Sequence, residues 1–444
     1  MHVVERFAAF AVSLRKKPLG KEVLHHAKRA VIDWYAAAFP GAVIPPATLL
    51  QKSLKEEIGR GKARLLLGKK ATTRAAALIN GAAAHAAEFD DIFRDGIYHP
   101  GAPTIAAVLA LGQEKSSTGL EFLRSIVAGY EISTRIGAAM GRAHYKYWHN
   151  TGTIGCFGAA AACAELLKLK QERFAHALAT VATFSAGLQQ AFRMDSMSKP
   201  LHAGHAAEAG LTAALAAKEG VTGSLDILEG EAGYGKAMGY GENKGPDWER
   251  ALSTLGTDFH ITRMTFKNHG CCGHTFAAID GALVLKEKMH FSPAEVEKVD
   301  VRTYRAALDV AGYEEPETPA EARFSLKYVV ANALNHGSVR LAAFEKKSLA
   351  DRKTRELMKK ISVSVDPELD AAFPGQRAAR VAITAGGRRE EFLQPTRKGD
   401  PEMPLSDREL EAKFLELAGP VAGKAGAKKL LERLWRLETE KRLP

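Results

Sequence analysis

The stretch from His85 to Gly101 combines acidic residues and histidines at a spacing that suits acid–base chemistry. An alanine-rich segment, typical of a helix, runs directly into Asp90 and Asp91, and His99 follows in a short loop. Carboxylates at the C-terminal end of a helix face the negative pole of its dipole, at a cost of roughly 0.3–1 kcal/mol. A carboxylate pair and an imidazole in this position are candidates for a general acid and base. A solvated loop with Asx and Pro–Gly turns is the alternative, and spacing alone favours it.

A second segment places His149 directly before a predicted helix. Asn150 or Thr151 can cap that helix, and its free N–H groups favour an anion. The same positive pole disfavours imidazolium, so we expect His149 to be neutral and able to accept a proton. The GxxGxxG spacing over 152–158 follows no strand, so we interpret it as close helix contact and not as a nucleotide loop.

In a third segment, Pro200 excludes Lys199 from helical geometry and can itself begin a helix. Lys199 then projects at a helix N-terminus, where its charge is unfavourable unless an anion binds. His202 and His205 lie three residues apart and share one helix face. An anion-binding or catalytic role, a packed histidine pair and a metal site all remain open for these residues.

A fourth segment, Lys267–His274, includes the neighbours Cys271 and Cys272. Such a cluster suggests a metal site or a nucleophilic thiol. Adjacent cysteines rarely bind one zinc ion together, so a hinge loop that contributes His274 to a ligand-binding crevice is at least as plausible. The chain contains no CxxC spacing of the kind that structural zinc or iron–sulfur sites use.

The length, cysteine count and net charge of the chain restrict the classes of protein to which it can belong. A length of 444 residues allows more than one domain, and four cysteines argue against a disulfide framework. The net charge of +11 suits either a nucleic-acid partner or an anionic substrate. The basic residues are scattered along the chain and no nucleic-acid-binding motif is present, so we predict no nucleic-acid partner. No signal peptide or membrane span is recognisable, which makes the cytoplasm the expected compartment.

The elements that must position these segments are mostly helices. Apolar residues recur at three- and four-residue steps over 20–38, 72–88, 103–114, 121–141, 151–167, 172–190 and 201–218. Strand-like alternation follows over 296–304, 361–365, 379–384 and 388–392, with one helix over 322–335. Two helices, over 406–418 and 424–441, complete the chain.

We therefore predict a mainly α protein with an α+β second domain. Residues 1–265 form the first part of a discontinuous, all-helical domain. Residues 266–395 form a smaller α+β lid domain, and residues 396–444 return to the helical domain. The crevice between the domains is the expected ligand site.

With these segments in hand, the chain resembles the MmgE/PrpD family, which includes 2-methylcitrate dehydratase, cis-aconitate decarboxylase and iminodisuccinate epimerase. Each motif is weak alone, but their order and spacing extend over nearly the whole chain. The motifs are FDD and HPG within Phe89–Gly101, GYE within Gly129–Gly137, HNTGTIG at His149–Gly155, SKPLHAGHAAEAG at Ser198–Gly210, FSLKY at Phe324–Tyr328 and KGDPEMPLSDRELEAKF at Lys398–Phe414.

The resemblance implies a homodimer formed through the helical domain, small anionic di- or tricarboxylate substrates, and no metal or organic cofactor. It implies catalysis next to a carboxylate carbon. The catalytic residues that we predict are Asp91, His99, His149, Lys199 and His274. The predicted substrate-binding residues are Lys199, His202, Thr151, Tyr328 and Lys267. Of the aspartate pair we select Asp91 as the acid–base group, with Asp90 as its structural neighbour.

The function predicted from the sequence is a cofactor-independent hydro-lyase similar to 2-methylcitrate dehydratase, an enzyme of propionate metabolism. It would abstract a proton next to a carboxylate and expel hydroxide. An epimerase or a decarboxylase of a related acid is the first alternative; a basic nucleic-acid-binding protein and a metal-dependent hydrolase using the His202/His205 and Cys271/Cys272 groups are more distant ones. Several positions depart from the family pattern, and we expect them to shape substrate recognition. They are Ile92, Phe93, His205, Glu208, Cys271 and Cys272.

Overall fold

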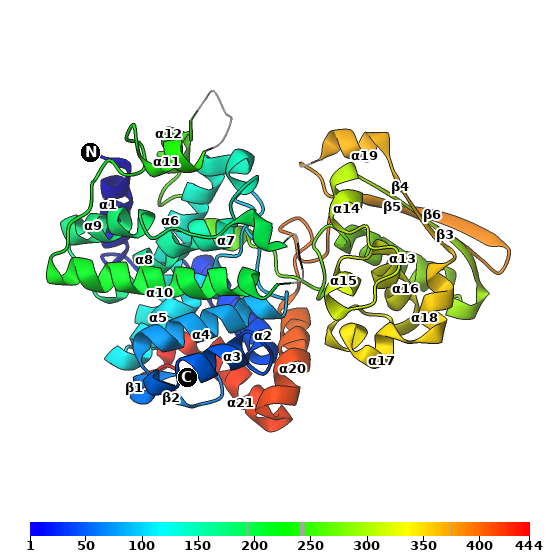
Figure 1. The fold of residues 1–444 in the computed structure, drawn as a ribbon, viewed down its shortest axis with the longest axis horizontal. Helices are drawn as coiled ribbons and strands as arrows, with labels where there is room; N and C mark the ends of the chain where they lie inside the picture. Colours follow the sequence, from blue (N-terminus) through cyan, green and yellow to red (C-terminus); the bar gives the residue numbers. More distant parts are fainter. Residues whose placement is uncertain (193, 195, 240–244, 374) are drawn as a thin grey trace. The chain divides into compact units, whose positions relative to one another are not determined.

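The computed structural model describes residues 1–444 except 193, 195, 240–244 and 374 (Figure 1). The chain divides into two compact units. The first unit comprises Met1–Thr265 and Ser406–Pro444, and the second comprises Phe266–Leu405. The first unit is therefore discontinuous in sequence and mainly helical, and the second combines helices with a small sheet.

The elements of the first unit follow the periodicity of the sequence closely. Its helices are α1 (Val3–Leu14), α2 (Lys21–Ala42), α3 (Ala47–Ser53), α4 (Thr73–Ala86), α5 (Gly101–Lys115), α6 (Gly119–Tyr145), α7 (Asn150–Thr153), α8 (Gly155–Leu166), α9 (Gln171–Ala182), α10 (Ser198–Glu219), α11 (Tyr234–Met238), α12 (Trp248–Ser253), α20 (Asp407–Ala422) and α21 (Lys424–Trp435). Its strands are β1 (Ile58–Arg64) and β2 (Lys70–Ala71).

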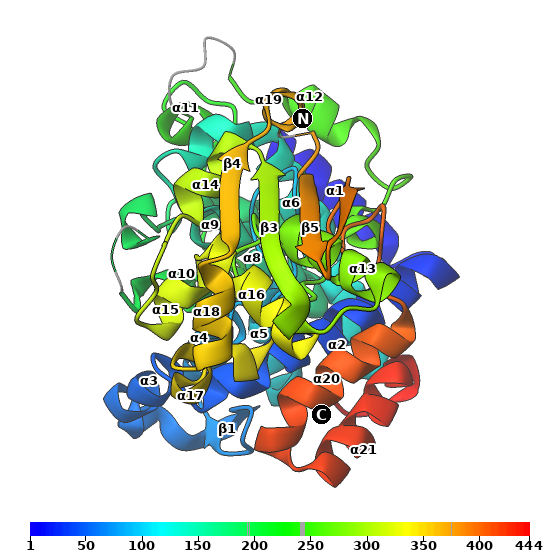
Figure 2. The ribbon, with the colours of Figure 1, turned by 90° about the vertical axis from the view of Figure 1, so that its right-hand side faces the viewer.

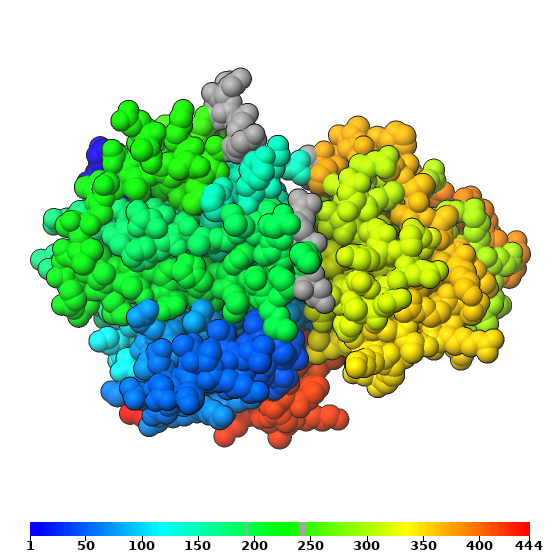
Figure 3. Space-filling view, in the orientation of Figure 1, coloured from blue at the N-terminus to red at the C-terminus, as the bar shows by residue number. Residues whose placement is uncertain are grey.

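Helix α10 lies at the centre of the packing in the first unit, against α4, α5, α8 and α9. Figure 3 shows the α10 segment in green beside the blue segment that includes α4. Alanines and glycines line these contacts because only small side chains let helix backbones approach closely. A Cβ atom at Gly204 of α10 would collide with the Leu78 carbonyl of α4, and one at Gly158 of α8 would lie 2.8 Å from Oγ of Ser133 in α6. The interpretation of the GxxGxxG spacing as close helix contact is confirmed.

The second unit is built around one mixed sheet. Its strands are β3 (Val296–Thr303), β4 (Ile361–Val365), β5 (Ala379–Ala385) and β6 (Arg388–Gln394). Its helices are α13 (Phe276–Met289), α14 (Arg305–Val310), α15 (Pro319–Arg323), α16 (Leu326–His336), α17 (Lys346–Leu349), α18 (Arg352–Met358) and α19 (Pro367–Ala372).

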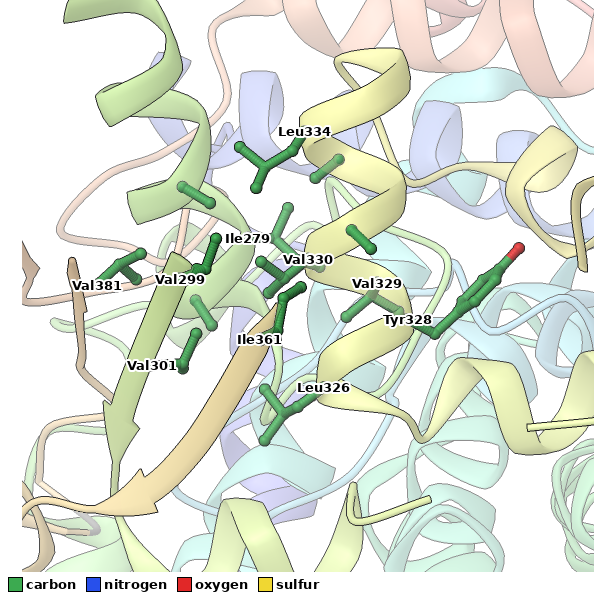
Figure 4. Packing of buried hydrophobic residues seen from close by; sticks show 14 of the residues in the cluster. Ile279, Val299, Val301, Leu326, Tyr328, Val329, Val330, Leu334, Ile361 and Val381 are labelled. Carbon is green, nitrogen blue, oxygen red and sulfur yellow. The ribbon is translucent and has the colours of Figure 1, made fainter. Parts of the chain in front are cut away.

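The sheet has the strand order β4–β3–β5–β6, with β3 and β4 parallel and the other pairs antiparallel (Figure 2). Helices α13 and α16 contact the strands. Figure 4 shows the resulting core, in which strand residues such as Val299 and Val381 lie with Ile279 and Val330 of the helices. The predicted β5–β6 hairpin is confirmed, since its turn at Gly386–Gly387 has positive φ at both residues, as a type I′ turn requires.

Three expectations need correction. The first unit is not all-helical, because Ile58–Arg64 and Lys70–Ala71 pair as a short antiparallel hairpin. The helix expected over 172–190 ends at Ala182. The return to the first unit begins at Ser406 and not at residue 396, because Arg397 and Lys398 still bond to Gly273 and Asp280 of the second unit.

No helix in the part of the chain that the structure describes is both long enough and apolar enough to cross a lipid bilayer.

Candidate functional site

Four histidines meet in the first unit although they come from distant parts of the sequence. His85 lies near the end of α4, His99 precedes α5, His149 is the residue before α7, and His202 lies in the first turns of α10. The ring centroid of His85 lies 4.7 Å from that of His99 and 5.3 Å from that of His149. The ring centroids of His149 and His202 are 5.2 Å apart. We refer to these four residues as the histidine cluster.

Asp90 holds one end of the histidine cluster. One of its carboxylate oxygens lies 2.7 Å from Nδ1 of His85 and 3.3 Å from Nδ1 of His99. The Asp90 and His85 side chains are almost wholly buried. Burial opposes ionisation of Asp90, but the charges and hydrogen bonds of the two histidines hold its pKa well below the usual range. Asp90 is therefore a fixed anion that orients two imidazoles.

Asp91, which we selected as the acid–base group, has partners outside the histidine cluster. Its two oxygens accept the backbone N–H of Gly101 at 3.0 Å and bond the hydroxyl of Tyr130 at 2.7 Å. Gly101 begins α5, so Asp91 caps that helix from outside. Burial, reinforced by the Asp33 carboxylate, raises the pKa of Asp91 to about 8. Asp90, not Asp91, is the carboxylate that contacts the histidines.

A buried ion pair supports the backbone just before the two aspartates. Nζ of Lys413, in α20, donates to the Asp33 carboxylate at 2.6 Å and to the carbonyl of Phe89 at 2.8 Å. Lys413 and Asp33 are almost wholly buried. Removal of one partner from such a pair leaves an uncompensated buried charge, so the pair is costly to break. Through its bond to the Phe89 carbonyl, Lys413 therefore fixes the backbone directly before Asp90. The C-terminal motif that includes Lys413 therefore has a structural function in the site.

Lys199 pairs with an anionic side chain of the protein itself. It lies in the first turn of α10 and forms an ion pair with Glu88, two residues beyond the end of α4. Both side chains are less than one-fifth exposed. Glu88 has a left-handed backbone, with φ of 61°, which costs a non-glycine residue about 1–3 kcal/mol and is typical of functional sites. An ammonium at this position is suited to bind a substrate carboxylate.

The other two histidines are held in the neutral form. Burial, together with the nearby positive charges of His85 and Lys199, lowers the pKa of His149 well below its usual range. Burial and the charge of His85 lower the pKa of His202 to about 4. Nδ1 of His149 lies 3.0 Å from Nδ1 of His202. A neutral imidazole can accept a proton, as we expected for His149.

The residues around His149 position the loop of His99. Thr151, predicted to bind substrate, is fully buried and its hydroxyl accepts the backbone N–H of His99 at 3.3 Å. Asn150 donates from its side-chain amide to the carbonyl of Gly96 at 2.7 Å. Neither side chain caps α7. Both therefore join the HNTGTIG segment to the loop that carries His99.

Ile92 and Phe93, which we expected to shape substrate recognition, are buried in the first unit. Ile92 exchanges backbone hydrogen bonds with Thr265, and the ring of Phe93 stacks on His260 with centroids 5.3 Å apart. These contacts give both residues a structural function.

Three predicted site residues belong to the second unit. Nδ1 of His274 lies 2.9 Å from the hydroxyl of Tyr304, and Lys267 is almost wholly buried. Tyr328 was expected near the substrate, but its hydroxyl donates to the carbonyl of Ala343 and its side chain is buried. Figure 4 shows Tyr328 on the side of α16 away from the sheet. The hydroxyl beside His274 is that of Tyr304.

The thiol and metal alternatives receive little support. Cys271 is fully buried, and burial raises the pKa of its thiol far above the physiological range, which disfavours a nucleophilic thiolate. Nε2 of His205 lies 3.1 Å from the carbonyl of Phe184. Within the described residues, His85, Asp90 and His99 form the one set whose ligand atoms, all within 4.8 Å of one another, could hold a metal ion.

Three candidate functional residues were not predicted from the sequence: His85, Glu88 and Tyr304. Asp90 was predicted only as the structural neighbour of Asp91. The signal was partly present, since His85 and Glu88 stand in the same motif as the aspartates. No periodicity distinguishes which of two adjacent loop carboxylates points toward a histidine, and nothing in the sequence connects Tyr304 with His274.

Comparison with known proteins identifies the family. The MmgE/PrpD N-terminal domain matches residues 5–247 and the MmgE/PrpD C-terminal domain matches residues 269–437. A cis-aconitate decarboxylase-like protein of Aspergillus oryzae is 25% identical over 99% of this chain and 95% of its own length. The cis-aconitate decarboxylase of Mus musculus is 26% identical over 93% of this chain and 86% of its own length.

A 2-methylcitrate dehydratase of Salmonella typhimurium is 31% identical over 133 residues, which are 29% of this chain and 26% of that protein. The two matching domains together span most of the sequence, and the chain thus belongs to the MmgE/PrpD family.

Proposed function

We propose that this protein is a cofactor-independent lyase that acts on a small di- or tricarboxylic acid. The observation that carries the proposal is the histidine cluster beside Lys199. Neutral imidazoles, a fixed carboxylate and an ammonium lie together in one largely buried group. They supply the base, the acid and the anion-binding charge that proton transfer next to a carboxylate needs.

The roles follow from the environment of each group. Lys199 binds a substrate carboxylate, which competes with the Glu88 carboxylate for the ammonium group. His149, held neutral, accepts the proton from the adjacent carbon. His99, oriented by Asp90, donates a proton to the group that leaves or to the carbanion that forms. These roles use groups of the first unit alone.

Between the two lyase types, the relatives favour a carboxy-lyase. The similarity to cis-aconitate decarboxylases extends over almost the whole chain, whereas the similarity to 2-methylcitrate dehydratases covers less than a third of it. A hydro-lyase similar to 2-methylcitrate dehydratase is the second candidate, because identity within that shorter stretch reaches 31%.

The test is a substrate screen with product detection by NMR in deuterated water. Purified protein is incubated with cis-aconitate, 2-methylcitrate, citrate and iminodisuccinate. Loss of CO₂ supports the carboxy-lyase, loss of water supports the hydro-lyase, and deuterium exchange at carbon without either supports an epimerase. If no acid reacts or exchanges, and none raises the melting temperature, the proposal is wrong.

A parallel measurement addresses the nucleic-acid alternative. Lysines and arginines outnumber acidic residues, so weak retention on DNA at low salt is expected. A DNA affinity that falls by a log–log slope of several units with salt, and that persists at physiological salt, would instead favour a nucleic-acid-binding protein.

A further inference from the structure

The contact between His149 and His202 joins two chemically identical atoms. Nδ1 of one ring lies 3.0 Å from Nδ1 of the other, which is a hydrogen-bond distance. A hydrogen bond needs one donor and one acceptor, and a neutral imidazole carries its proton on only one of its two nitrogens. When both rings are neutral, one proton therefore lies between them, and its position fixes the tautomer of both.

The pair has two arrangements. If Nδ1 of His149 carries the shared proton, Nε2 of His149 has a lone pair and can act as a base. If Nδ1 of His202 carries it, Nε2 of His149 is protonated and can act as an acid. The tautomer of a catalytic histidine is usually fixed by a carboxylate or a carbonyl, which can only accept a hydrogen bond. An imidazole can do either.

We propose that His202 is a positioning residue that sets the tautomer of His149, and so decides whether Nε2 of His149 can accept a proton or donate one. The proposal rests on the lyase function proposed above, because it assigns a proton-transfer role to His149. It also gives His202 a function other than the substrate binding that the sequence suggested.

The surroundings hold the two rings in register. The backbone N–H of His149 donates to the carbonyl of Gly187 at 2.9 Å. A Cβ atom at Gly187 would lie 3.2 Å from Cγ of His202, and one at Gly152 would lie 3.1 Å from Cβ of His202. Gly187 also has φ of 133°, which favours glycine. A side chain at either glycine would therefore press on His202, so both glycines let the backbone lie close to it.

The lowered pKa values of both histidines agree with two neutral rings that share one proton. His149 is buried whereas His202 is partly exposed, so the pair also connects the buried cluster with solvent. When Nε2 of His149 takes a proton from a carbon acid, its Nδ1–H bond breaks and that proton bonds to Nδ1 of His202. The Nε2–H proton of His202 then passes to water. One proton enters the pair and one leaves it, and both rings end neutral.

The experiment reads the tautomer of His149 directly. Protein labelled with ¹⁵N-histidine is examined by NMR correlation of ring carbon-bound protons with both ring nitrogens, and the His149 signal is identified by its loss in His149→Gln. In His202→Asp the carboxylate can only accept, so His149 is expected to show a single Nδ1–H tautomer. In His202→Leu the partner is absent, and the pattern should shift away from that of the unmodified protein.

His205→Asn is the matched control. His205 lies on the same helix and contacts the carbonyl of Phe184, so its replacement should leave the His149 signals in place. Backbone amide spectra of each variant verify the fold. An unchanged His149 pattern in both His202→Asp and His202→Leu would overturn the proposal.

Kinetics then separate this inference from the lyase function. His202→Leu should lower kcat by about 10²-fold or more, with a smaller change in KM, and His202→Asn, whose amide can donate or accept, should recover part of kcat. Normal turnover in His202→Leu would overturn the proposal. If the tautomer responds but no carboxylic acid reacts, the lyase function fails and the pairing stands. If an acid reacts but the tautomer does not respond, the pairing alone fails.

Discussion

Replacing each aspartate of the adjacent pair by asparagine should have opposite consequences. Asp90 is an ionised partner for the buried His85 and for His99, which is partly exposed. A hydrogen bond to a charged group contributes roughly 1.5–3 kcal/mol and a neutral one roughly 0.5–1.5 kcal/mol. Asp90→Asn keeps the shape but loses the charge, so we expect a loss of about 2–3 kcal/mol for the two bonds together. With His99 no longer oriented, kcat should fall by about 10²–10⁴-fold.

Asp91→Asn should be tolerated, because a pKa of about 8 keeps Asp91 protonated at pH 7. The asparagine oxygen can accept the N–H of Gly101, and its amide N–H can donate to the Tyr130 hydroxyl, which donates to Asp91 in the unmodified protein. We expect kcat to stay within about tenfold, the equivalent of roughly 1.4 kcal/mol.

The stability of the Asp91 variant has a predictable dependence on pH. The pKa of Asp91 is raised in the folded protein from 3.8 to about 8. The folded protein binds this proton more tightly than the unfolded chain does, and the resulting stabilisation is fully present below pH 3.8. It decreases as the pH rises and is lost once the pH has passed 8. Asparagine has no proton to lose, so the stability of Asp91→Asn should rise relative to that of the unmodified protein between about pH 4 and 8. The rise should be at most about 1.4 kcal/mol per pH unit. Above pH 8 the difference in stability should stay constant.

The assays are steady-state kinetics on the substrate found by the screen and urea unfolding at pH 5, 6, 7 and 8. The reasoning would be refuted if Asp91→Asn lost activity as strongly as we expect for Asp90→Asn while Asp90→Asn remained active. A stability difference for Asp91→Asn that stays constant with pH would refute the account of its environment.

Three further predictions concern the contacts around the site. Lys199→Met should raise KM by about 10- to 100-fold, since a charge-assisted bond contributes roughly 1.5–3 kcal/mol. Glu88→Gln removes the anion that competes with the substrate for Lys199 and should lower KM. A higher KM in Glu88→Gln would contradict the proposed competition. Lys413→Met should cost about 3–5 kcal/mol in urea unfolding because it leaves Asp33 buried and unpaired, and the double variant with Asp33→Asn should recover part of that loss; equal costs for the single and double variants would be evidence against this explanation. Dialysis against EDTA should leave kcat unchanged, and loss of activity that returns with a divalent cation would instead make the Asp90 group a metal site.

Local patterns of residues were enough to predict which segments form the site and whether helices or strands carry them. Periodic apolar residues predicted the helices of the first unit and the strands of the second, because burial of a face imposes a repeat on the residues themselves. Turn chemistry predicted the Gly386–Gly387 hairpin for a similarly local reason. The hairpin of Ile58–Arg64 with Lys70–Ala71 escaped prediction because its residues are mostly exposed and carry no apolar alternation.

Which side chains meet depends on how the folded elements pack. Adjacent loop residues direct their side chains differently, so Asp90 reaches His85 and His99 while Asp91 reaches the start of α5. The contact between His149 and His202 joins residues that are 53 positions apart, and it forms because α7 and α10 pack together. Local pattern specifies an element, but the partners of a buried polar group are chosen by the packing of elements that the sequence order does not bring together.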